Sequence, residues 1–139
     1  MTTIEASESG DTLRVVLIDT RPERRELVRH LVASTGLADT DIAEAANTAE
    51  AVALLDREDR DVVVVEIQMP VSQGLETVAA LRSRSSKLRI VVCSFTCDPA
   101  TKALALANGA DAYLDKPVSS VSLKDLLLGY ATHTRQPGG

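Results

Sequence analysis

The feature that most limits how this chain can fold is the stretch DVVVVEI at residues 61–67, where four consecutive valines precede a glutamate. Valine favours strands, and a strand that is apolar at every position buries both of its faces. Such strands occupy the middle of parallel sheets that are covered by helices on both sides. The stretch also raises a chemical question, because the carboxylate of Glu66 stands near the end of an otherwise apolar strand.

Further short runs rich in apolar and β-branched residues alternate with segments of helical periodicity. Besides 61–67, the predicted strands are residues 13–19, 40–45, 88–94 and 111–115. Strands that alternate with helices in this way predict an α/β fold, in which one parallel sheet is covered on both faces.

In the segments between the strands, apolar residues recur every three or four positions, as in an amphipathic helix. In the first such segment the recurring residues are Leu27, Val28, Leu31 and Val32. Capping residues and prolines predict where each helix starts. In chain order, the five predicted starts are near Pro22, at the Asn47–Glu50 capping box, after Gly74, at Asp98–Pro99 and at Ser122. The fourth helix is expected to end at Asn108–Gly109.

Length and charge narrow the class of protein. The chain has 139 residues and a mass of 14.8 kDa, which fits one domain with a single core. We expect a flexible N-terminal segment at residues 1–11, a domain at 12–130 and a flexible tail at 131–139. The net charge of -5 argues against direct binding to nucleic acid or to an anionic membrane. Because the chain has neither a secretion signal nor an apolar run of about 18 residues, we expect a cytoplasmic protein.

Polar residues stand at or just after the ends of four predicted strands. Asp19 ends the first strand, Glu66 lies near the end of the third, Ser94 ends the fourth and Lys116 follows the fifth. In an open parallel sheet, binding sites form outside the carboxyl ends of the strands. We therefore expect two carboxylates, a hydroxyl and an ammonium group to converge at one edge of the sheet.

Other reactive side chains give no indication of an enzyme. Cys93 and Cys97 are four residues apart, a spacing that suits neither a zinc site nor a redox pair. Neither His30 nor His133 has a Ser or Cys partner at a spacing typical of nucleophilic catalysis. We therefore expect the chain to have no enzymatic activity of its own.

With these residues in place, the span from Leu13 to Tyr130 resembles the receiver domain of response regulators, the phosphoacceptor half of two-component signalling. The resemblance rests on VLID at the end of the first strand, EIQMPVSQG in and after the third, Ser94, and GADAYLDKP around the fifth. It implies a flavodoxin-like fold, a doubly wound five-stranded parallel sheet in the order 2-1-3-4-5. A flavin-binding domain of the same fold is disfavoured, because the loop DTRPERR lacks glycine and has one hydroxyl.

The resemblance also implies roles for single residues. Glu66 stands where the family has the aspartate that accepts a phosphoryl group. Ser94 matches the hydroxyl that reads the phosphoryl group, and Lys116 matches the lysine that pairs with it. Tyr113 matches the aromatic residue that changes rotamer on activation.

Three positions depart from the family pattern. They are Glu66 itself, Thr20 in place of the second acid that helps to bind magnesium, and Phe95 where Ala or Gly is usual. Magnesium prefers carboxylate and water ligands, so Asp19 and Glu66 without a further acid should bind it weakly or not at all. The extra methylene of glutamate advances its carboxylate by about 1.5 Å, one C–C bond. Phosphoryl transfer depends on in-line positioning, and Phe95 would also crowd an incoming phosphodonor.

These departures predict an atypical receiver, or pseudo-receiver, that signals by protein–protein contact and is not phosphorylated at the usual position. The expected partner is a histidine kinase or an effector, bound through the fourth helix, the fifth strand and the fifth helix. No cofactor is required in this interpretation. The alternatives are a phosphorylatable receiver with another acceptor, such as Asp19, and a module that binds a small ligand in the strand-end pocket.

Two questions stay open in the sequence. The Glu66 carboxylate either mimics the phosphorylated state or forms a structural ion pair with Lys116. Basic residues also cluster at Arg21, Arg24, Arg25 and Arg29 and at residues 82–89. Solvated surfaces are the expected role of these clusters in an acidic chain, and contact with an acidic partner or nucleic acid is the alternative.

Overall fold

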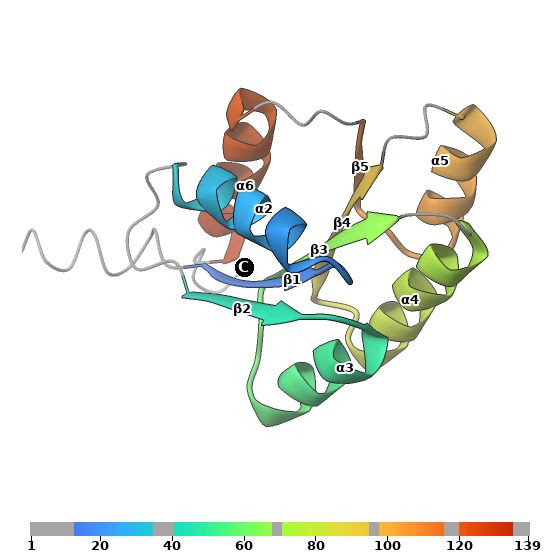
Figure 1. Cartoon of the computed structure of the whole chain (residues 1–139), viewed down its shortest axis with the longest axis horizontal. Coiled ribbons are helices and arrows are strands. Elements are labelled where there is room, and N and C mark those ends of the chain that lie inside the picture. Colours follow the sequence, from blue (N-terminus) through green and yellow to red (C-terminus); the bar gives the residue numbers. More distant parts are fainter. Residues whose placement is uncertain (1–12, 35–40, 68–70, 95–97, 116–119, 135–139) are drawn as a thin grey trace, which may run out of the picture.

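The computed structural model describes residues 13–34, 41–67, 71–94, 98–115 and 120–134 (Figure 1). Its strands form one parallel sheet in the order β2-β1-β3-β4-β5, which confirms the predicted fold and strand order. The strands are β1 (Arg14–Ile18), β2 (Asp41–Ala45), β3 (Val62–Ile67), β4 (Arg89–Ser94) and β5 (Ala112–Asp115). The helices are α2 (Pro22–Ala33), α3 (Thr48–Arg57), α4 (Val71–Arg84), α5 (Pro99–Ala107) and α6 (Ser120–Thr134).

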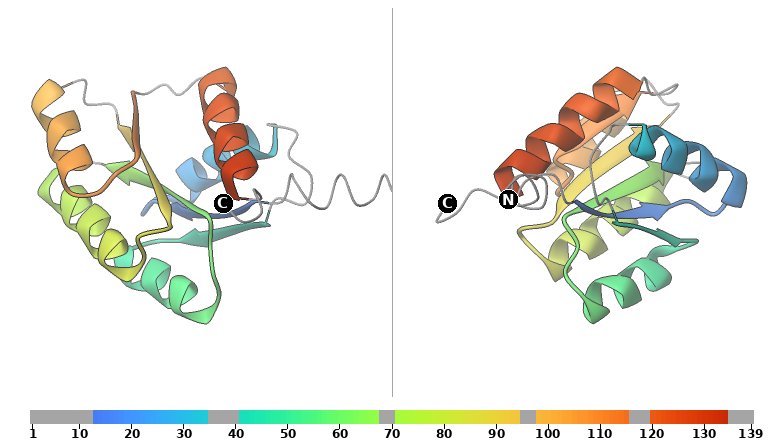
Figure 2. Two further views of the ribbon diagram at one scale, coloured as in Figure 1. Left: turned by 180° about the vertical axis from the view of Figure 1, so that it is seen from behind. Right: turned by 90° about the vertical axis from the view of Figure 1, so that its left-hand side faces the viewer.

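The helices form a layer on each side of the sheet, as the views in Figures 1 and 2 show. Val63 and Val65 of β3 pack on the side of α3, α4 and α5, together with Val78 and Leu81. Their neighbours in β3, at positions 62 and 64, pack on the side of α2 and α6. The four valines are almost fully buried, so the central strand is covered on both faces as its composition predicts.

Side chains at the helix starts explain where α3 and α5 begin. Asn47 caps α3, and its Oδ1 accepts the N–H of Glu50 at 2.9 Å. The returning bond of the predicted capping box is displaced by one residue, because the Glu50 carboxylate accepts the N–H of Ala46 at 2.8 Å. Asp98 caps α5 with a bond from the N–H of Ala100 at 3.1 Å, and Pro99 follows in the first turn.

Two helices extend beyond their predicted bounds. α4 begins at Val71, not after Gly74, so Gly74 lies inside the helix. A Cβ atom at Gly74 would lie 2.6 Å from Cγ1 of Ile67, and the absence of a side chain therefore lets α4 approach the end of β3. α6 begins at Ser120 rather than Ser122 and continues to Thr134, so residues 131–134 of the expected tail are helical. Residues 1–11 lie outside the described part of the chain.

The buried face of α2 does not include every apolar residue that recurs at helical spacing. Leu27 of α2 is 62% exposed, whereas Val32 is buried and Val28 and Leu31 are partly buried against the sheet. The buried stripe of α2 is therefore narrower than the helical periodicity indicates. Leu27 stands on the outer side of the helix.

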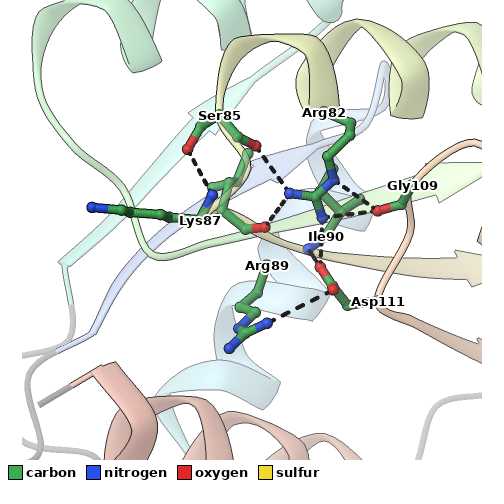
Figure 3. Close-up of polar contacts among 8 residues, drawn as sticks. Arg82, Ser85, Lys87, Arg89, Ile90, Gly109 and Asp111 are labelled. Atoms are coloured by element: carbon green, nitrogen blue, oxygen red, sulfur yellow. Dashed lines mark hydrogen bonds and ion pairs between the residues drawn. The ribbon is translucent and has the colours of Figure 1, made fainter. Parts of the chain in front are cut away.

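The amino edge of the sheet is held together by Arg82 at the end of α4 (Figure 3). Its guanidinium donates to the carbonyl oxygens of Ser85, Leu88 and Gly109 at 2.8–3.1 Å and to Asp111 Oδ2 at 2.7 Å. The same Asp111 oxygen accepts the N–H of Ile90 at 2.8 Å. This set of contacts, the Arg82 network, joins α4, the start of β4 and the turn before β5.

Gly109 makes this approach possible. It ends α5 with a φ of 119°, a conformation that favours glycine. A Cβ atom at this position would lie 2.8 Å from Cγ of Arg82. The Asn108–Gly109 end predicted for this helix is confirmed, and its second role is to admit the Arg82 side chain.

No helix in the described ranges is both long enough and apolar enough to span a membrane.

Candidate functional site

The carboxyl edge of the sheet brings Asp19 and Glu66 to adjacent strands. Asp19 follows β1 and is 6% exposed, with its N–H bonded to the carbonyl oxygen of Ala45 at 3.1 Å. Its Oδ1 accepts the N–H of Arg21 at 2.9 Å, so the carboxylate also shapes the turn into α2. Glu66 is the penultimate residue of β3, and its side chain is 4% exposed.

Glu66 forms an ion pair with Arg24, which lies in the first turn of α2. The distance between Arg24 Nη1 and Glu66 Oε2 is 3.8 Å, which is a charge–charge contact rather than a hydrogen bond. The Arg24 side chain is 27% exposed, so the guanidinium lies at the rim and the carboxylate lies below it. Sequence reasoning missed this pairing. The available signal was that the first turn after β1 begins at the same sheet edge as Glu66.

A cleft of about 620 Å³ opens beside these carboxylates, between the starts of α3 and α4. Its lining among the described residues mixes apolar residues with polar ones, and the polar residues are Asp19, Thr20, Glu66, Asn47, Thr48, Gln73, Glu76 and Thr77. The hydroxyls of Thr48 and Thr77 lie 2.7 Å apart and join α3 to α4. The cleft can therefore offer acidic, hydroxyl and amide groups to a small polar molecule.

Ser94 lies at the expected strand end but does not line this cleft among its described residues. It is fully buried, and it pairs in register with Ile67 of β3. Side chains alternate along a strand, so Ser94 shares the sheet face of Val92 while Glu66 shares the opposite face with Val64. Asp19 and Glu66 therefore line the same cleft, whereas Ser94 is buried in the core.

Tyr113 of β5 is half-buried and packs against the core on the side of α3, α4 and α5. It is next to Val92 of β4 in the register of the sheet. Lys116, Phe95 and the Met69–Pro70 pair of the stretch EIQMPVSQG lie outside the described residues.

The basic residues of α2 are not simply a solvated surface. Arg25 Nε and Arg29 Nε lie 2.9 Å and 2.8 Å from the two carboxylate oxygens of Glu44 in β2. Arg25 also donates to the carbonyl oxygen of Asp19, and Arg29 donates to that of Ile42 at 3.2 Å. The hydrogen bond from Arg25 and then that from Arg29 lower the pKa of Glu44 below its ordinary value. These arginines therefore tie α2 to the edge of the sheet.

The described residues at this edge can be compared with what a magnesium ion requires. Among them, no three Asp, Glu, His or Cys side chains gather closely enough to ligate a metal ion. The two carboxylates at the sheet edge are those of Asp19 and Glu66, and the adjacent Thr20 is neutral. A guanidinium already lies 3.8 Å from one of them, so the charge that a divalent ion needs is partly neutralised.

Comparison with known proteins assigns the class. A doubly wound sheet with acidic residues at its carboxyl edge is the arrangement of a receiver-type signalling domain. The profile of the response regulator receiver domain family matches residues 15–128. The chain therefore belongs to the response regulator receiver domain family.

Individual relatives agree with this assignment. The nitrate/nitrite response regulator protein NarL of Escherichia coli (strain K12) is 35% identical over 109 residues, which are 78% of this chain and 50% of that protein. The chemotaxis protein CheY of Halobacterium salinarum is 29% identical over 115 residues, which are 82% of this chain and 92% of that protein. The solved structure of chemotaxis protein CheY4 of Vibrio cholerae has a TM-score of 0.74 and 27% identity, covering 86% of this chain and 98% of that one. The chain spans about half the length of NarL, the first of these relatives.

Proposed function

We propose that this chain is an atypical receiver, a pseudo-receiver, which signals by protein–protein contact without phosphorylation at position 66. The proposal rests on the position, the burial and the ion pairing of Glu66. It stands at the family's acceptor position, its side chain is 4% exposed, and it forms an ion pair with Arg24. A carboxylate held in this way is a poor nucleophile toward a phosphodonor, because transfer needs access, in-line geometry and neutralisation of the phosphoryl charge.

The proposed partner surface is formed by α5, β5 and α6, the fourth helix, fifth strand and fifth helix of the sequence-based expectation. Receiver domains work with histidine kinases and with effector domains, and either would be a partner of suitable kind. Leu104 and Leu106 of α5 are 51% and 41% exposed, which provides apolar area for such a contact. The proposal requires no cofactor or enzymatic activity, and it places the protein in the cytoplasm.

The test is incubation with acetyl phosphate and magnesium, followed by intact-mass measurement. We expect the mass to remain unchanged, while a phosphorylatable receiver treated in parallel gains one phosphoryl group. A stoichiometric gain in the wild type would overturn the proposal. Peptide mass spectrometry of the phosphorylated protein would then locate the phosphoryl group and show whether the acceptor is Asp19. The burial of Asp19 and its bond from Arg21 speak against this outcome.

The cleft beside Glu66 favours a second candidate, a module that binds a small polar ligand. Its volume of about 620 Å³ and the polar residues in its mixed lining support this candidate. A panel of polar metabolites in a thermal-shift assay tests it. The expected sign of binding is a rise in melting temperature that Thr77→Val, at the cleft wall, reduces.

A further inference from the structure

The cation beside Glu66 comes from the chain itself. Asp19 and Glu66 are both nearly buried at the edge of the sheet where the resemblance of this chain to receiver domains implies a magnesium site. A buried carboxylate is costly unless a positive charge or hydrogen-bond donors face it. In this chain the positive charge nearest to Glu66 in the described residues is the guanidinium of Arg24.

We propose that Arg24 replaces the divalent cation, so that its guanidinium neutralises Glu66 and excludes metal from the Asp19–Glu66 edge. The inference rests on the proposed function only in treating Glu66 as an unmodified carboxylate. It adds the positioning residue that keeps this carboxylate in place. A divalent ion bound to Glu66 would lie within a few ångströms of the guanidinium, and like charges at that separation repel strongly.

The local structure commits Arg24 to this position. Asp19 accepts the N–H of Arg21, and the carbonyl oxygen of Arg21 accepts the N–H groups of Arg24 and Arg25 at 3.1 Å. These bonds fix the first turn of α2 next to the end of β1, and the ion pair with Glu66 connects that turn to β3. Arg25 and Arg29 are turned toward Glu44, so Arg24 is the arginine of this helix that faces Glu66.

The experiment measures Mn²⁺ binding by electron paramagnetic resonance, with the melting temperature as a second readout. Arg24→Met keeps much of the side-chain length and removes the charge. We expect this variant to bind Mn²⁺ at least about tenfold more tightly than the wild type, as expected when a like charge a few ångströms away is removed. Its melting temperature should rise with Mn²⁺, whereas that of the wild type should not.

Three further variants separate the site from the net charge. Arg21→Met removes the same charge from an exposed side chain three residues away, and it should change Mn²⁺ affinity by less than about threefold because solvent screens it. Arg24→Lys keeps the charge and should behave like the wild type. Arg24→Met combined with Glu66→Gln should lose the gain, because the carboxylate that binds the ion is gone.

Equal Mn²⁺ affinity in the wild type and Arg24→Met, or an equal gain in Arg21→Met, would overturn the inference. Arg24→Met could also be unfolded in the presence of a chelator. Recovery of its fold on addition of Mn²⁺ would then support the replacement, and failure to recover would contradict it. Because the readout is metal affinity, the result is separate from that of the phosphorylation assay, which tests the proposed function.

Discussion

At the scale of single residues, Glu66 and Glu44 show how a carboxylate at the sheet edge is neutralised. Glu66 is nearly buried and faces one guanidinium at 3.8 Å, whereas Glu44 is more exposed and receives two arginines at 2.8–2.9 Å. The sequence favours Lys116 as the structural partner of Glu66, a contact that lies outside the described residues. With Arg24 present, a structural ion pair at Glu66 no longer depends on Lys116.

The first prediction separates mimicry from structural pairing at Glu66. Glu66→Gln keeps the shape of the side chain and removes its charge. If the charge biases the domain toward its partner-binding state, losing a contact worth about 1–3 kcal/mol should lower partner binding by roughly 5–150-fold. If Glu66 only pairs with Arg24, the melting temperature falls and partner binding stays unchanged.

The measurement compares the proteins that wild-type and Glu66→Gln baits retain from native lysate, by quantitative mass spectrometry, together with the melting temperatures of both baits. Glu76→Gln is the matched control, because Glu76 lines the same cleft from α4 and is exposed. Unchanged retention by a folded Glu66→Gln bait would rule out mimicry.

The second prediction concerns the pH dependence of stability. The pKa of Glu44 is lowered from 4.5 in the folded state by its hydrogen bonds to Arg25 and Arg29. A lowered folded-state pKa means that Glu44 stabilises the fold above the unfolded-state value, and that this contribution is lost as the pH falls through the folded-state value. Glu44→Gln should therefore be less stable than the wild type at neutral pH, by up to about 1 kcal/mol for a partly exposed pair.

Urea denaturation at neutral pH and at a series of values below 4.5 tests this. The difference between the wild type and Glu44→Gln should shrink on acidification. Asp125→Asn, an exposed substitution in α6, serves as the control and should show no such convergence. A difference that stayed constant with pH would show that the ionised carboxylate is not what stabilises the contact.

At the scale of elements, the two ends of the sheet are secured in different ways. Arginines of α2 hold the carboxyl edge, and the Arg82 network holds the amino edge (Figure 3). Arg89 extends this network toward α6, with its guanidinium 3.9 Å from Asp111 and 5.6 Å from the centre of the Tyr130 ring. Burial raises the pKa of Tyr130, and the nearby Asp111 raises it further. The network therefore connects Gly109 after α5, Asp111 before β5 and Tyr130 of α6, the three elements of the proposed partner surface.

The third prediction tests the Arg82 network. Arg82→Met should destabilise the fold by about 1–3 kcal/mol, because it leaves the partly buried carbonyl groups of Ser85, Leu88 and Gly109 without a charged donor. Arg84→Met, two residues along the same helix, removes an exposed pair with Asp56 at 3.4 Å and should cost less than about 1 kcal/mol. Chemical denaturation of both variants decides the point, and equal losses would show that the network has no special role.

At the scale of the whole molecule, the exposed leucines lie on opposite sides of the sheet. Leu104 and Leu106 stand on α5, within the proposed partner surface, whereas Leu27 stands on α2 in the other helix layer. All three are more than 40% exposed, so replacing them should affect stability little while changing the character of the surface.

The fourth prediction uses this separation. Leu104→Asp should reduce the retention of partner proteins from native lysate by at least about tenfold, the size expected when a charge enters an apolar contact. Leu27→Asp, which introduces the same group on α2, should retain them as the wild type does. Loss of retention in Leu27→Asp but not in Leu104→Asp would show that partners bind to α2 instead.

The sequence alone determined the elements and their order, because their causes are local. The valine run of β3, the Asn47 and Asp98 caps and the Gly109 helix end depend on residues within one turn or one strand. The strand bounds accordingly lie within one residue of those predicted. The acidic strand ends could also be identified from the sequence itself, whereas the strand order was implied by the resemblance to receiver domains.

Only the tertiary structure decided which charges meet. Arg24 is far from Glu66 in the sequence, and Arg82 is far from Asp111, so each pairing depends on strand order and on the rotation of a helix about its axis. The exposure of Leu27 has the same origin, since helical periodicity marks a candidate face and packing determines how wide the buried stripe is. The position of α4 likewise depends on the contact between Gly74 and Ile67, two residues on different elements. These contacts join residues that are far apart in the chain, so they leave no periodic signal in the sequence.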